Sequence, residues 1–264
     1  MVTSKEVFLF PGYGRAHGKT GEQLMEDAIV RYRCAVADSR PFALLGHSLG
    51  FLAALVCAGA FTVDDGRRII RAQEQAVSRY GQPEGGMVTL ELNETAAATV
   101  AADVGDPGLA VACINAPDRT VLSGPVAALR QVAEHAKQQD VVCVRLPIDV
   151  AYHSPMLNDV VAPLRAELDR IPQHRLHAPV YSATTHQFCS DDDDLLTAMV
   201  EALVLPVRFE DAVLRMDSLG AARFVECGPD PLLVKLVRLS LPGAERLPVH
   251  RTNSVTPCWY VHPR

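Results

Sequence analysis

The sequence has few aromatic residues, a single tryptophan and no closely paired cysteines. Its seven cysteines stand alone in the 264-residue chain, and several lie in apolar, strand-like runs such as VACI and VVCV. An odd number of isolated thiols without a CxxC pair argues against a disulfide framework and against the common zinc motifs. The pattern favours free, buried thiols in a reducing cytosol, and it predicts no metal site.

An excess of positive charge is also absent. The chain has 25 lysines and arginines against 31 aspartates and glutamates, a formal net charge of −6 at pH 7, which argues against a nucleic-acid partner. The first residues, MVTSKEVFLFPGYG, lack the charged and apolar regions of a signal peptide, and no apolar run is long enough to span a membrane. We therefore expect a soluble, cytoplasmic protein that binds neither nucleic acid nor membrane.

Apolar, β-branched runs alternate with helical patterns along most of the chain. The runs typical of buried strands lie at 6–10, 42–46, 179–184, 223–227 and 246–250. The segments with helical patterns lie at 20–39, 52–61, 64–77, 154–171, 192–219 and 231–241. This alternation predicts an α/β fold with a largely parallel sheet, followed by a polar, irregular tail at 252–264.

The stretch 86–148 follows a different order. Its patterns read strand, helix, strand, strand, helix, strand in close succession, which is the order of a ferredoxin-like motif. We therefore predict two domains. Residues 1–84 and 152–264 form a parallel-sheet, α/β-hydrolase-like core, and residues 85–151 form an inserted ferredoxin-like α+β subdomain.

The pentapeptide Gly46-His47-Ser48-Leu49-Gly50 lies between a buried strand and an apolar helix. This is the context of a nucleophile elbow, in which glycines permit a sharp turn and the serine hydroxyl is exposed at a helix N-terminus. Ser48 is therefore the candidate nucleophile, and the backbone N–H of Leu49 is a candidate oxyanion donor. The alternative is a small residue in a glycine-rich turn. The chain order of α/β-hydrolases fits poorly, because only one clear strand precedes Ser48.

A serine nucleophile needs a base, and the chain has nine histidines. His47 adjoins Ser48, but neighbouring side chains on an elbow point apart. His153 lies in LPIDVAYHSPML, after a strand and directly before a helix, where the insert returns to the core. A base at such a junction can face a cleft, so His153 is the candidate base, with a surface position as the alternative.

Six motifs occur in an order that resembles malonyl-CoA:acyl-carrier-protein transacylases and the acyltransferase domains of polyketide synthases. They are FLFPGYG, GHSLG, INAPDRTVLSGP, LPIDVAYHSPML, LPVRFEDAV and FVECGPDPLL, and the resemblance covers residues 6 to about 240. It implies the same fold, an α/β core with a ferredoxin-like insert.

The resemblance also implies a mechanism, a two-step acyl transfer through a serine–histidine dyad. Ser48 attacks a thioester, and His153 takes its proton and returns it to the departing thiol. The oxyanion donors correspond to the backbone N–H groups of Leu49 and Tyr13. A main-chain carbonyl orients the histidine in this family, and we expect it to come from the ECGP segment around Gly228.

The same resemblance implies the substrates and partners. No cofactor is bound, and the substrates are phosphopantetheine thioesters on an acyl-carrier protein or on CoA. The expected partner is an acyl-carrier protein, and the expected state is a monomer. Carrier proteins are acidic, so docking needs a local basic patch, for which the candidates are Arg67, Arg68, Arg208 and Arg238.

The sequence departs from the family at the position that binds malonate. Family members have an arginine on the helix after the nucleophile, where it holds the malonyl carboxylate. An ungapped count from Ser48 places Gln73 there, and Arg71 lies roughly 200° around the helix. Burying malonate without a cation costs several kcal/mol, so we expect a neutral acyl group.

Other pocket positions differ as well. Tyr13 stands where the family has glutamine, and Phe51 where it has glutamate. Tyr152 matches a bulky position that limits substituents on the acyl α-carbon, with simple packing as the alternative. Asn115 and Met87 complete the expected substrate-binding set.

The segment 15–46 is also short, since family members have about twice that length there. Taken together, the residues predict a trans-acting acyltransferase that moves a non-malonyl acyl group in polyketide-type biosynthesis. The alternatives are an editing hydrolase that releases acyl groups from the carrier, an ordinary malonyl transacylase, and a carrier-docking protein without catalysis.

Overall fold

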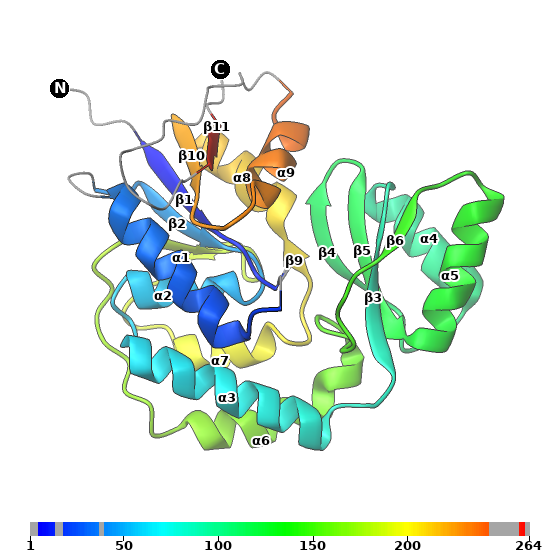
Figure 1. Cartoon of the computed structure of the whole chain (residues 1–264), viewed down its shortest axis with the longest axis horizontal. Helices are drawn as coiled ribbons and strands as arrows, with labels where there is room; N and C mark the ends of the chain where they lie inside the picture. Colours follow the sequence, from blue (N-terminus) through cyan, green and yellow to red (C-terminus); the bar gives the residue numbers. More distant parts are fainter. Residues whose placement is uncertain (1–4, 14–17, 37–39, 243–258, 262–264) are drawn as a thin grey trace. The chain divides into compact units, whose positions relative to one another are not determined.

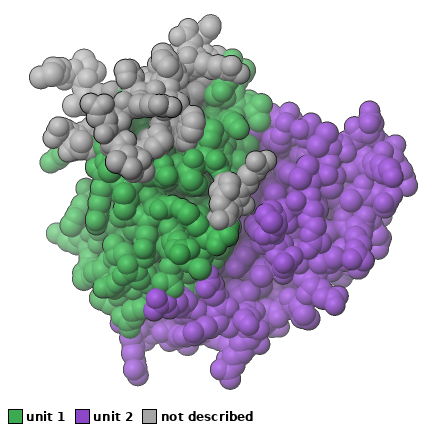
Figure 2. All heavy atoms as spheres, in the orientation of Figure 1, with its two compact units in different colours: residues 1–70, 171–195, 210–264 green, residues 71–170, 196–209 purple. Residues whose placement is uncertain are grey.

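The computed structural model describes residues 5–13, 18–36, 40–242 and 259–261. The described chain forms two compact units (Figure 2). Unit 1 comprises residues 1–70, 171–195 and 210–264, and unit 2 comprises residues 71–170 and 196–209. Within the described ranges, no helix combines the length and apolar character needed to cross a membrane.

Unit 1 contains a six-stranded sheet in the order β11-β10-β1-β2-β7-β8 (Figure 1). Its four central strands, β10, β1, β2 and β7, are parallel, and β8 and β11 pair antiparallel at the edges. All five residues of β1 are buried, as expected for a central parallel strand covered on both faces. The strands are β1 (Glu6–Phe10), β2 (Ala43–Gly46), β7 (Val180–Ser182), β8 (Gln187–Phe188), β10 (Arg223–Glu226) and β11 (Trp259–Val261).

The predicted parallel sheet is thus confirmed, with two differences at its edges. The tail predicted to be irregular contains β11, which pairs with β10. The strand predicted at 246–250 lies outside the described residues.

Unit 1 contains α1 (Gly21–Val36), α2 (Gly50–Cys57) and α9 (Leu232–Ser240), together with α8 (Phe209–Ser218) except its first residue and the first part of α3 (Val63–Tyr80). Thr20 caps α1, because its hydroxyl accepts the Gln23 N–H at 3.3 Å and the Gln23 side chain accepts the Thr20 N–H at 3.0 Å. The almost wholly apolar α2 contacts β1, β2 and β7, which explains why its sequence shows no polar face.

Unit 2 contains a five-stranded sheet in the order β6-β3-β5-β4-β9. After the end of α3, six consecutive elements of unit 2 are β3 (Gly85–Leu90), α4 (Glu94–Val104), β4 (Ala110–Ala116), β5 (Arg119–Pro125), α5 (Val126–Gln138) and β6 (Cys143–Arg145). The four strands among them pair antiparallel, and α4 and α5 cover one face (Figure 1). Val88, Leu122 and Leu129 belong to the apolar core beneath these helices. The predicted ferredoxin-like order is confirmed.

The rest of unit 2 differs from the sequence prediction in detail. The helix expected at 154–171 is a 3₁₀ turn, η1 (Pro155–Leu157), followed by α6 (Asn158–Leu168). The helical run expected at 192–219 is two helices, α7 (Leu195–Glu201) and α8, separated by the short strand β9 (Val207–Arg208). β9 extends the sheet by pairing parallel with β4.

The compact units divide the chain at other residues than the predicted domain boundaries. Unit 2 contains all of the predicted insert, 85–151, together with residues 71–84, 152–170 and 196–209. The units are defined by packing contacts, whereas the predicted domains are defined by the order of strands and helices. The predicted domain boundaries therefore stay a prediction.

A buried carboxylate joins β10 to α9 in unit 1. Glu226 is fully buried and accepts the backbone N–H groups of Leu232, Leu233 and Val234 at 2.9–3.1 Å. Burial raises the pKa of Glu226 to about 7, the three N–H groups oppose this shift, and nearby Asp230 adds to it. Between about pH 4.5 and 7, Glu226 is therefore mostly protonated in the folded protein and mostly ionised in the unfolded chain.

This proton gives stability a defined pH dependence. The pKa rises from 4.5 to about 7 on folding, so the contribution of Glu226 is complete below about pH 4.5 and is lost as the pH rises through 7. In denaturant unfolding, the stability of the native chain relative to Glu226→Gln should fall between pH 4.5 and 7, by at most about 1.4 kcal/mol per pH unit. Exposed Glu134→Gln serves as control. A rise over the same range would mean that the N–H groups outweigh burial.

Candidate active site

The turn around Ser48 is built from backbone that lies too close for side chains. A Cβ on Gly50 would come within 1.9 Å of the Phe10 carbonyl oxygen, and one on Gly46 within 2.3 Å of the Phe51 backbone nitrogen. Ser48 itself has a φ of 54°, the left-handed region that costs a non-glycine residue about 1–2 kcal/mol. β2 is therefore joined to α2 by a strained turn. Ser48 lies in this turn, and it is partly exposed.

The loop after β1 lies against this elbow. A Cβ on Gly12 would lie 2.8 Å from the His47 carbonyl oxygen and 3.1 Å from the Ser48 Cβ. The predicted oxyanion donors are therefore near each other in the fold of unit 1, because Tyr13 follows Gly12 directly and Leu49 follows Ser48. The N-terminus of α2 adds its dipole at the same place, which favours negative charge.

The same loop lines one wall of a cavity. Pro11, Gly12 and Tyr13 line it together with Leu24 and the residues that lead into α9, and its volume is about 170 Å³. Glu226, Asp230 and Lys235 are the ionisable residues at its wall.

His153, in unit 2, is buried, and three backbone carbonyls accept hydrogen bonds from it. Its backbone N–H donates to the Leu203 carbonyl at 2.7 Å, and its Nδ1 lies 2.7 Å from the Ala202 carbonyl oxygen and 3.1 Å from that of Leu205. Because a carbonyl oxygen only accepts, Nδ1 carries a proton, which assigns the neutral form of this imidazole to the tautomer with its lone pair on Nε2. Its φ of 60° shows that the backbone here is strained too.

This geometry corrects the predicted source of the orienting carbonyl. The acceptors of Nδ1 are Ala202 and Leu205, on the segment between α7 and β9, and not the ECGP segment around Gly228. Sequence reasoning missed them because any residue supplies a carbonyl. The one available signal was position, since Leu205 opens the LPVRFEDAV motif.

The other predicted pocket residues are distributed over both units. In unit 2, Tyr152 is half-buried with its ring centroid 6.5 Å from that of His153, and Met87 is buried on β3. Half-buried Asn115 lies on β4 where the register with β5 shifts, and half-buried Gln73 lies on α3. In unit 1, Phe51 is buried in the first turn of α2. Their roles in substrate binding stay predictions.

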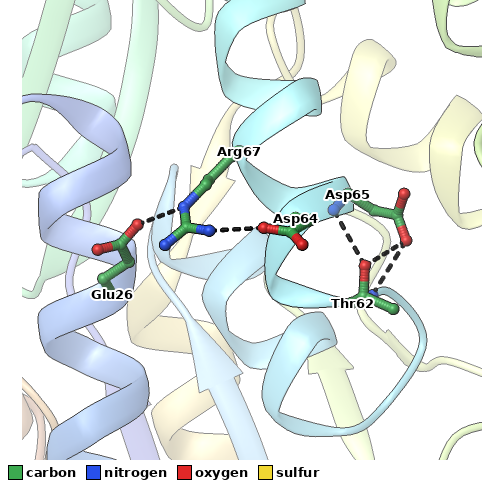
Figure 3. Close-up of polar contacts among 5 residues, drawn as sticks. All are labelled: Glu26, Thr62, Asp64, Asp65 and Arg67. Atoms are coloured by element: carbon green, nitrogen blue, oxygen red, sulfur yellow. Dashed lines mark hydrogen bonds and ion pairs between the residues drawn. The ribbon is translucent and has the colours of Figure 1, made fainter.

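Three of the four arginines predicted to form a basic patch are neutralised by carboxylates. Arg67 contacts Glu26 at 2.6 Å and Asp64 at 2.5 Å (Figure 3). Arg68 lies 3.4 Å from Asp65, whose backbone N–H and side chain also bond Thr62 at the start of α3. Arg208 forms a two-pronged ion pair with Glu94. These positions therefore present less positive charge than the sequence suggests.

Ser48 thus lies on a strained strand–turn–helix elbow at the N-terminus of α2, an arrangement typical of enzymes that form an acyl-serine intermediate. The comparisons with known proteins give the family. The model of the acyl transferase domain family matches residues 23–252, which is most of the chain. The chain belongs to the acyl transferase domain family, and the prediction of an acyltransferase is confirmed.

Relatives and solved structures agree with this assignment. The chain is 34% identical over 207 residues to the spectinabilin polyketide synthase system protein NorA' of Streptomyces orinoci, covering 77% of this chain and 6% of the relative. It is 31% identical over 209 residues to the polyketide biosynthesis protein ThaF of Burkholderia thailandensis, covering 76% of this chain and 17% of that protein. The chain thus spans only a small part of these relatives.

Among solved structures, the acyltransferase domain of an iterative polyketide synthase in enediyne biosynthesis superposes with a TM-score of 0.78 at 32% identity, covering 89% of this chain and 63% of that one. The malonyl CoA-acyl carrier protein transacylase of Coxiella burnetii superposes with a TM-score of 0.80 at 23% identity, covering 90% and 91%. The second likeness concerns the fold alone, and both confirm the two-sheet α/β architecture.

The strain at Ser48 makes a prediction that does not depend on activity. Both Ser48→Ala and Ser48→Gly remove the hydroxyl, but only glycine adopts a φ of 54° without steric cost. We expect Ser48→Gly to be more stable than Ser48→Ala by about 1 kcal/mol in chemical denaturation. Equal stabilities would show that the elbow is not strained.

Proposed function

We propose that this chain transfers an acyl group between thioesters through an acyl-enzyme on Ser48, with His153 as the base. The Ser48 hydroxyl attacks the thioester carbonyl carbon while Nε2 of His153 takes its proton. The N–H groups of Leu49 and Tyr13 stabilise the resulting oxyanion. When the carbon–sulfur bond breaks, the thiol leaves with the proton from His153, and the acyl group remains on the serine oxygen. A second thiol then repeats these steps in reverse order.

The observation that supports this assignment of roles is the contact of the His153 Nδ1 with two carbonyl oxygens. Two carbonyls accept from Nδ1, so the neutral imidazole presents an unprotonated Nε2 without needing an aspartate. The proposal also requires an accessible serine hydroxyl. The strained turn at Ser48 exposes this hydroxyl near the backbone N–H groups that are proposed as oxyanion donors.

The proposed substrates are phosphopantetheine thioesters, carried by an acyl-carrier protein or by CoA, and no bound cofactor is needed. Support comes from the family and from a fold relative described as a malonyl-transacylase in complex with a type II polyketide acyl-carrier protein (TM-score 0.83, 18% identity). The polyketide synthase relatives support a role in polyketide-type biosynthesis. We propose further that the chain acts in trans on the carrier, as a cytoplasmic monomer.

The acyl group that we propose is neutral. In α3, which is continuous from Val63 to Tyr80, half-buried Gln73 occupies the position at which the family's carboxylate-binding arginine is expected. Arg71 is exposed and about 200° away around the helix. A glutamine amide hydrogen-bonds a carboxylate but does not neutralise it, and an uncompensated buried charge costs several kcal/mol.

Intact-mass spectrometry tests the proposal directly. The protein is mixed with acetyl-, longer acyl- and malonyl-thioesters on CoA and on a separately added carrier protein. We expect stable adducts from the neutral donors, little from malonyl, and none in Ser48→Ala. We expect His153→Asn to slow acylation by about a hundredfold or more, because asparagine tolerates the left-handed backbone at this position.

Each other outcome of this experiment identifies one of the alternatives. A malonyl adduct as abundant as the acetyl adduct indicates an ordinary malonyl transacylase. Acyl loss to water without transfer to the carrier indicates an editing hydrolase. The absence of an adduct with every donor would leave a carrier-docking protein without catalysis.

Restoring the cation should restore the malonyl specificity. Gln73→Arg should raise the rate of malonyl acylation by about tenfold or more relative to acetyl acylation, because a bidentate arginine compensates the carboxylate. The matched control is Gln75→Arg, which adds the same charge at an exposed position of α3. An equal response to both variants would mean that Gln73 does not line the acyl pocket.

A further inference from the structure

The segment that binds His153 is held in place by the strand that follows it, β9. The three carbonyls that bind His153 belong to residues 202–205. This segment continues directly into β9 (Val207–Arg208), and all of these residues lie in unit 2. The orientation of the imidazole therefore depends on where β9 is fixed.

The strand pairing of β9 is a weak attachment. β9 is two residues long and lies at the edge of the five-stranded sheet, where, within the described part of the chain, its one partner strand is β4, through Val207 with Cys113 and Arg208 with Ile114. Each backbone hydrogen bond contributes about 0.5–1.5 kcal/mol. A ladder this short, open on one side, needs a second attachment to define its position.

A side-chain pair supplies that second attachment. Arg208 donates from Nη1 to Oε1 of Glu94 at 2.7 Å and from Nη2 to Oε2 at 2.9 Å, the planar two-pronged geometry that only arginine provides. Glu94 is the first residue of α4, and α4 is fixed to the sheet through buried Ala97 and Val100. The pair thus fastens β9 to a rigid element.

The connection from Arg208 back to the histidine is short and stiff. Only Pro206 and Val207 separate Arg208 from Leu205, whose carbonyl lies 3.1 Å from Nδ1 of His153. Proline fixes its own φ and restricts the residue before it to extended backbone. A displacement of Arg208 is therefore passed to the Leu205 carbonyl rather than absorbed between them.

We infer that the Glu94–Arg208 pair positions the base: it holds β9 so that the carbonyls of Ala202 and Leu205 fix the imidazole of His153. The inference rests on the proposed function, because it takes His153 as the base. Glu94 and Arg208 are positioning residues, which act through the segment 202–205. Since a partly exposed ion pair adds little to global stability, the pair should affect the reaction more than the fold.

The test compares two ion pairs of unit 2, Glu94–Arg208, which includes a residue of β9, and Glu91–Arg119, which does not. Glu94→Gln removes one arm of the positioning pair, whose side chains are 41% and 30% exposed. Glu91→Gln removes the matched arm of the Glu91–Arg119 pair, which spans 2.8 Å with side chains 43% and 27% exposed. We expect Glu94→Gln to lower kcat for acylation about fivefold with KM unchanged, and Glu91→Gln to have little effect. The charge exchange Glu94→Arg with Arg208→Glu should recover part of kcat.

A spectroscopic readout separates this inference from the proposed function. The Nδ1 proton of His153, buried and bound to carbonyls, should give a downfield proton NMR signal, assigned by its loss in His153→Asn. Glu94→Gln should shift or broaden this signal, and Glu91→Gln should leave it unchanged. An unchanged signal and kcat in Glu94→Gln, or equal changes in both variants, would overturn the inference. If no donor acylates the protein, the proposed function fails, and the NMR signal alone still decides whether Glu94 positions His153.

Discussion

The turn around Ser48 depends on the position of the Phe10 carbonyl. This carbonyl accepts the His47 N–H at 2.9 Å and leaves no space for a side chain at Gly50. This contact brings the start of α2 against the end of β1, so the chain has to turn from β2 into α2 within three residues. The left-handed φ of Ser48 is the consequence of this confined path, and it exposes the hydroxyl.

The layered fold follows from local sequence patterns, whereas its edges follow from distant pairing. β1, β2 and the β-α-β-β-α-β order of unit 2 are visible as apolar and helical periodicities, and the structure has them. β9 is different, because two residues carry no periodicity and become a strand only by pairing with β4, far earlier in the chain. For the same reason the sequence pattern predicts an irregular tail where β11 lies, and one helical run over 192–219 where β9 separates two helices.

In the candidate site, too, the sequence predicts one part and not the other. It indicates the side chains, and it does not indicate the backbone groups that orient them. Ser48 and His153 can be proposed from the sequence because their chemistry is in their side chains. The carbonyls of Ala202, Leu203 and Leu205 were not found, since a main-chain acceptor has no residue type. The positive charge expected of the basic patch is too high for a related reason. The sequence shows arginines such as Arg67, but it does not show that carboxylates already bind them.

The backbone acceptors around His153 also determine which genetic changes this site tolerates. A point substitution at position 202, 203 or 205 replaces a side chain and keeps the carbonyl, so the orientation of the His153 imidazole is insensitive to the residue types there. An insertion or deletion of a single residue between α7 and β9 is different, because it shifts every carbonyl relative to the imidazole. Selection acting on this segment should therefore preserve its length more strictly than its composition.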